Sequence, residues 1–88
     1  MPRIKTDELL SKVSRGDFTA IKLKAIQSGS FILLLESADG VFIHENQDGS
    51  MKEYPKADNA IIWLKRMTKV NEIVLDLTLW RGAELHSI

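Results

Sequence analysis

The stretch FTAIKLKAIQSGSFILLLESADGVFIHENQDGSMKEY, residues 18–54, decides the fold. Three turn signals divide it into short runs of β-branched, aliphatic and aromatic residues: Gln27-Ser28-Gly29-Ser30, Ala38-Asp39-Gly40 and Asn46-Gln47-Asp48-Gly49. A glycine that follows serine or aspartate supplies the positive φ that tight hairpin turns need. The pattern therefore predicts an antiparallel meander with strands at 18–26, 31–36, 41–45 and 51–54.

The second of these runs is apolar on both faces. Phe31, Leu33 and Leu35 point to one side of the strand, and Ile32 and Leu34 point to the other. Such a strand belongs in the middle of a sheet with both faces covered. The fourth run, 51–54, is short and polar, which is typical of an edge strand.

Helical spacing appears on both sides of the meander. A short helix is predicted from Thr6 or Asp7 to Gly16, and a second from Ala57 or Asp58 to Met67. A last strand is predicted at 72–80. The element order is then α-β-β-β-β-α-β, and the simplest sheet order is 5-1-2-3-4, with strand five antiparallel to strand one.

We therefore expect an α+β fold, a five-stranded mainly antiparallel sheet with one principal helix packed on one face. The predicted core places four strand residues against two residues of the second helix: Ile21, Leu23, Ile32 and Leu34 against Ile61 and Leu64.

The composition indicates one folded domain over residues 1–88. Hydrophobic residues make up 44% of the chain, and cysteine is absent, which excludes disulfides, thiolate nucleophiles and cysteine zinc sites. The N-terminus lacks the apolar core of a secretory signal, and the longest apolar run, Phe31–Leu35, is too short to span a membrane. We expect a soluble cytoplasmic protein without a membrane partner.

No group of residues predicts catalysis. His44 and Glu45 are neighbours on a strand and point to opposite faces, so they do not converge, and His44 is interpreted as a surface or core-edge residue. The glycines are isolated and form no phosphate-binding loop. We expect no catalytic residue, metal, cofactor or small-molecule ligand, and hence no enzyme.

Two groups of cations suggest an alternative function, a nucleic-acid-binding regulator. Lys22 and Lys24 share one face of the first strand, and Lys65, Arg66 and Lys69 cluster at the end of the second helix. Against this stands the charge balance, because 12 basic and 12 acidic residues cancel. Proteins that wrap duplex DNA usually carry a positive excess.

The doubly apolar strand leads to the favoured prediction, a non-enzymatic protein-interaction or regulatory module that self-associates. If the second helix covers one face, then Phe31, Leu33 and Leu35 lie on the other, and an exposed patch of this kind is rare on a monomer. Either the first helix and the tail, through Leu85 and Ile88, fold across that face, or a second copy covers it; the second option is favoured. We expect a homodimer, or binding to another protein, with Trp80 as a further contact residue.

Three segments carry a family resemblance: Arg3-Ile4-Lys5-Thr6-Asp7-Glu8-Leu9-Leu10, Ser30-Phe31-Ile32-Leu33 and Ala57-Asp58-Asn59-Ala60. With these segments the chain resembles small uncharacterised bacterial single-domain proteins of unknown function. The resemblance implies a bacterial single-domain protein and carries over no site residue.

Overall fold

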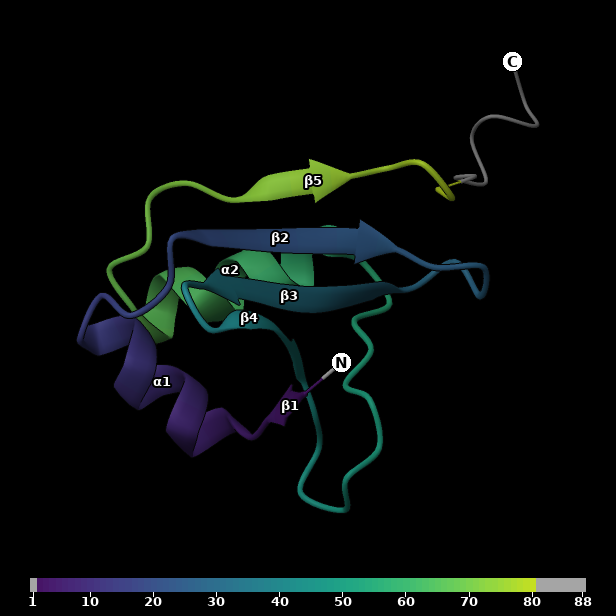
Figure 1. Ribbon diagram of the computed structural model, residues 1–88. Coiled ribbons are helices and arrows are strands. Elements are labelled where there is room, and N and C mark those ends of the chain that lie inside the picture. The colour runs from purple at the N-terminus through teal and green to yellow at the C-terminus, as the bar shows by residue number, and fades with distance from the viewer. Residues whose placement is uncertain (1, 81–88) are drawn as a thin grey trace.

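A computed structural model of the chain describes residues 2–80. The elements are β1 (Arg3–Ile4), α1 (Thr6–Ser14), β2 (Ala20–Ala25), β3 (Phe31–Ser37), β4 (Gly40–His44), α2 (Ala57–Met67) and β5 (Val74–Asp76) (Figure 1). The strands form one five-stranded sheet in the order β1-β4-β3-β2-β5. The pairs β2–β3 and β3–β4 are antiparallel, whereas β1–β4 and β2–β5 are parallel. The α+β class is confirmed, but the sheet is mixed and its order differs from the predicted one.

The predicted edge strand at 51–54 is wrong. This segment makes only two isolated bridges, Glu45 with Met51 and Phe31 with Tyr54. The place beside β4 is taken by the start of the chain, where Pro2 and Ile4 accept backbone hydrogen bonds of 2.9 Å from Ile43 and Glu45. A two-residue strand such as β1 is too short to show an alternating pattern, so periodicity does not predict it.

The last strand is shorter than predicted and runs parallel to β2, not antiparallel. It ends after Asp76 because the Asp76 side chain closes a turn: Oδ1 accepts hydrogen bonds from the amide (3.1 Å) and the hydroxyl (2.7 Å) of Thr78. Aspartate and threonine favour such local bonds over continued strand pairing. The predicted strand at 72–80 is thus reduced to Val74–Asp76.

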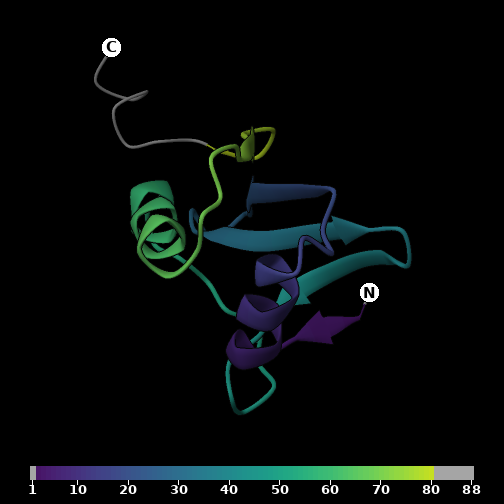
Figure 2. The ribbon, with the colours of Figure 1, turned by 90° about the vertical axis from the view of Figure 1, so that its left-hand side faces the viewer.

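Both helices pack on the same face of the sheet, with α2 beside the strands in Figure 2. β3 is central, as predicted, and Phe31, Leu33 and Leu35 lie on this helix-covered face. Their predicted position on the face opposite the second helix is wrong, because α1 and α2 both cover them. The predicted cover by the tail lies outside the described residues. The buried cluster on this side consists of Ile4, Leu9, Ile21, Leu23, Ala25, Phe31, Leu33, Leu35, Tyr54, Ala60 and Leu64.

The helix-free face carries Ile32 and Leu34, so their predicted packing against α2 is wrong. Both side chains are nevertheless buried. In the strand register Lys24 lies beside Ile32, and Lys22 and Ile43 lie on either side of Leu34. The aliphatic stems of lysine cover neighbouring apolar side chains while the ammonium groups stay in water.

The helices begin and end close to the predicted positions. α2 has the predicted bounds, and Gly16 follows α1 at φ 73°, a left-handed conformation that favours glycine. The N-cap of α1 is Lys5, and no side chain caps that helix. The predicted cap at Thr6 or Asp7 is wrong, because both residues are already helical, and the Thr6 hydroxyl bonds to His44.

Candidate functional site: the groove between the helices

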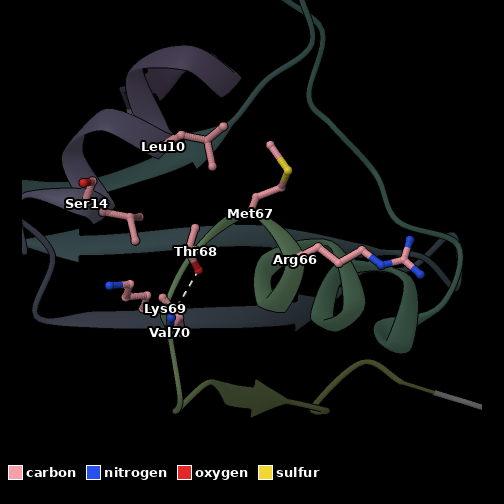
Figure 3. Close-up of a pocket in the computed structure, with 8 residues that line it drawn as sticks. Leu10, Ser14, Arg66, Met67, Thr68, Lys69 and Val70 are labelled. Carbon is pink, nitrogen blue, oxygen red and sulfur yellow. Dashed lines mark hydrogen bonds between the residues drawn. The ribbon is translucent and has the colours of Figure 1, made fainter.

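A cavity of about 520 Å³ opens between α1 and the end of α2 (Figure 3). We call it the interhelical groove, and its lining residues are Leu10, Val13, Ser14, Arg66, Met67, Thr68, Lys69 and Val70. The residues come from two helices and from the segment that leaves α2 for the sheet edge. The groove is therefore a product of tertiary packing.

The middle of the groove is apolar. Leu10 and Val13 are three positions apart on α1 and so share one helix face. In Figure 3 Leu10 and Met67 point toward one another across the opening. Met67 remains 53% exposed. A methionine side chain is flexible and polarisable, which suits a surface that adapts to a partner.

The ends of the groove are positive. Arg66 and Lys69 extend to opposite sides in Figure 3, and none of the eight lining residues is acidic. Within residues 2–80 neither cation forms an ion pair. The groove thus presents an apolar centre between two cations that form no ion pair with any described residue.

The wall formed by 68–71 is fixed by local hydrogen bonds. The Thr68 hydroxyl donates to the carbonyl of Leu64 (2.7 Å) and accepts from the amide of Val70 (3.2 Å). Lys65 Nζ donates to the Val70 carbonyl (3.3 Å) and to Asn71 Oδ1 (3.0 Å). These bonds satisfy the Leu64 carbonyl at the C-terminal end of α2 and fix the conformation of residues 68–71.

A second site, the His44 cluster of Thr6, His44, Tyr54 and Trp63, holds the two helices to the sheet. His44 Nε2 lies 2.9 Å from the Thr6 hydroxyl, and Nδ1 lies 3.0 Å from the Tyr54 hydroxyl. The Trp63 ring stacks on the imidazole at 5.5 Å and 20°. The cluster ties the first turn of α1 and the middle of α2 to β4.

The histidine ring is neutral. It is only 2% exposed, and burial, assisted by the charge of Lys52, lowers the pKa of His44 to about 4. Burial also raises the pKa of Tyr54 to about 12. A neutral ring donates through one nitrogen and accepts through the other, and hydroxyl groups serve in either role. The cluster is therefore a set of satisfied neutral hydrogen bonds.

A smaller cavity of about 340 Å³ lies beside this cluster, lined by Thr6, His44, Lys52, Glu53, Tyr54, Pro55, Asn59 and Trp63. Among residues 2–80, no buried side-chain nitrogen or oxygen lacks a hydrogen-bond partner. Both ring nitrogens of His44 are engaged by hydroxyl groups. This arrangement serves packing, and the groove is the better binding surface.

The predicted cations fall into two separate groups. Lys22 and Lys24 lie on the helix-free face, where Lys22 pairs with Glu36 at 3.5 Å. Lys65, Arg66 and Lys69 lie at the end of α2, on the other side of the sheet. The structure joins Arg66 and Lys69 in the groove but does not bring them together with the strand lysines.

The predicted protein contacts lie elsewhere than expected. Phe31, Leu33 and Leu35 are buried beneath the helices, and Trp80 is half-buried against the same cluster. Sequence reasoning missed two features. Met67 ends a helical apolar pattern but stays exposed, and His44 shares a strand face with Phe42 and thus points into the core.

Comparison with known proteins adds no relative: neither a protein-family model nor a curated protein matches the chain. The described part of the chain holds no group of three or more side chains suited to a metal ion. No helix in residues 2–80 is long and apolar enough to cross a bilayer. The case for a function therefore comes from the groove.

Proposed function

We propose that this protein is a non-catalytic interaction module that docks an acidic amphipathic helix of another protein in the interhelical groove. The observation that carries the proposal is the pairing of an exposed apolar centre, Met67 opposite Leu10, with a cation at each end. Apolar anchors supply affinity in helix-in-groove recognition, and charges at the rim select the partner.

The groove matches a helix better than an extended strand. One side is α1, and the other is the end of α2 with residues 68–70; none of the lining residues belongs to a strand, so the groove offers no sheet edge for main-chain pairing. An amphipathic helix offers apolar side chains at i and i+4 to Leu10 and Met67. Acidic residues before and after these anchors would then meet Arg66 and Lys69.

A non-catalytic role agrees with the chemistry of the described residues. The buried titratable groups, His44 and Tyr54, are neutral and bonded to one another. Catalytic acid–base groups usually have pKa values near the working pH and face a cavity that substrate can enter. The His44 cluster instead keeps its polar atoms occupied.

The test uses a synthetic helical peptide with leucines at i, i+4 and i+7 and glutamates at both ends, labelled for fluorescence anisotropy. A matched peptide replaces each glutamate by lysine. We expect tighter binding of the acidic peptide, loss of binding in Met67→Glu, and reversed charge preference in a double variant, Arg66→Glu with Lys69→Glu. Ile62→Glu is the control, because Ile62 is a half-exposed α2 residue outside the groove.

Equal binding of the two peptides, or equal loss in the control variant, would contradict the proposal. A salt-sensitive interaction with duplex DNA, weakened by Lys22→Glu and Lys24→Glu, would support the nucleic-acid alternative instead. NMR chemical-shift changes on peptide addition locate the contact, and shifts confined to residues outside the groove would also count against it.

A further inference from the structure

β5 and the turn that follows it form the second exposed apolar surface. Val74, Leu75, Leu77 and Leu79 are 40–52% exposed, and they account for four of the six exposed large hydrophobic residues in the described chain. β5 lies at the border of the sheet in Figure 1, paired on one side with β2. Within residues 2–80 no strand pairs with its other side.

Apart from its short length, this edge lacks the features that usually prevent strand pairing. Natural edge strands are protected by a very short strand, by proline, by bulges or by several charges. β5 has one charged residue, Asp76. The chain also has no net charge at neutral pH, with 12 basic and 12 acidic residues, so two copies do not repel one another at long range.

We infer that two copies of the chain pair through β5, antiparallel and about a two-fold axis that passes beside Leu75. The two five-stranded sheets then continue into one. A two-fold contact needs only one self-complementary surface, and an antiparallel edge pair supplies hydrogen bonds between the unpaired backbone groups of both strands.

Charge selects this register among the possible ones. A two-fold axis at Leu75 places Leu75 opposite Leu75, and Val74 opposite Asp76 of the second copy. An axis at Asp76 would place the two aspartates opposite one another, and an axis at Val74 would place Asp76 opposite Glu72. Like charges directly opposite destabilise a strand pair.

The flanking lysines favour the same register. In β2, Lys24 lies beside Asp76 and Lys22 lies beside Val74. Across the new pair, each Asp76 then lies in one row between Lys24 of its own chain and Lys22 of the second copy. Each carboxylate therefore has a cation from both chains in its row. On this helix-free face Lys24 is the direct cross-strand neighbour of Asp76, whereas Lys22 of the second copy lies one strand further away, beyond Val74 of that copy.

The contact is small. β5 is three residues long, and a stable interface buries about 800 Å² on each partner. We therefore expect a weak dimer, whose population rises with protein concentration. The groove lies on the helix-covered side and remains open in each copy.

Sedimentation equilibrium on the 88-residue chain tests the inference, over about 5–500 μM protein. We expect the mean mass to rise from 10.0 kDa toward twice that value. Val74→Lys places a cation opposite Asp76 of the other copy and should tighten the dimer, and Val74→Asp should weaken it. Two such pairs form per dimer, so each change should be about two- to thirtyfold.

Ile62→Lys and Ile62→Asp are the matched controls, because Ile62 has similar exposure on α2 and lies away from β5. Circular dichroism checks that every variant is folded. A 10.0 kDa species at all concentrations would overturn the inference. A dimer whose dissociation constant is the same in the wild type, Val74→Lys and Val74→Asp would also overturn it. Met67→Glu should leave the dimer unchanged, so failure of groove binding and failure of dimerisation are separate results.

Discussion

Acidification should destabilise this protein through His44, and the loss should vanish when that residue no longer titrates. The buried ring is held neutral, with its pKa lowered from 6.5 to about 4. The unfolded chain takes up a proton near pH 6.5, whereas the folded chain resists it until about pH 4. Stability contributed by this group is thus complete above pH 6.5 and falls as the pH drops toward 4.

The size of the effect follows from the two pKa values. Each tenfold difference in proton affinity corresponds to about 1.4 kcal/mol, so the lowering is worth about 2.5 kcal/mol between pH 7.5 and 4.5. The ring is only 2% exposed, so solvent screening changes this figure little. A domain of this size has about 4–13 kcal/mol in total. The loss is therefore a large share of the free energy of unfolding.

Urea denaturation of the wild type and of His44→Gln, at pH values between 7.5 and 4.5, measures the effect. Glutamine keeps a donor and an acceptor but does not titrate in this range. We expect the variant to be less stable than the wild type at pH 7.5 and to lose about 2.5 kcal/mol less on acidification. Carboxylate titration is common to both proteins and cancels in the comparison. Equal pH slopes for the two proteins would refute the reasoning.

Three further substitutions test the packing by urea denaturation. Leu64→Ala removes a fully buried side chain and should lower the free energy of unfolding by about 2–5 kcal/mol. Ile62→Ala, on the exposed face of the same helix, should change it by less than about 0.5 kcal/mol. Equal effects would show that α2 packs through another face. Thr6→Val leaves one imidazole nitrogen without its partner and should cost about 1–3 kcal/mol; a neutral result would mean that solvent replaces the hydroxyl. Gly16→Ala should cost about 1 kcal/mol, for backbone reasons alone, because the added Cβ meets no atom within 4 Å at φ 73°, and an unchanged midpoint would show that this turn relaxes.

The sequence predicted the elements that have a strong local pattern. Glycine turn signals define the hairpins around β2, β3 and β4, and helical spacing defines α1 and α2. The central position of β3 followed from its apolar residues on both faces. These features depend on near neighbours in the chain, and a local pattern is sufficient to find them.

The predictions that were wrong concern contacts between segments that are far apart in the sequence. β1 is two residues long, and it is a strand only through its parallel pairing with β4. The face assignment of β3 failed because both faces are apolar, so the pattern does not say which one meets the helices. His44 was expected at the surface or at the core edge, yet three partners from distant parts of the chain satisfy its ring. No single-residue pattern contains that information.

The two proposed contacts share one continuous segment of the chain. Met67 lines the groove at the end of α2, residues 68–73 connect the helix to the sheet, and Val74–Asp76 form the sheet edge. The segment is anchored where it leaves α2, because Lys65 bonds to Val70 and Asn71 and because Thr68 caps the helix end. A partner helix in contact with Met67 therefore lies next to residues 68–71, whose conformation is fixed by these hydrogen bonds and which are followed in the chain by β5. Pairing of two copies would likewise fix the far end of the segment, and a dimer would present two grooves to one partner that carries two helices.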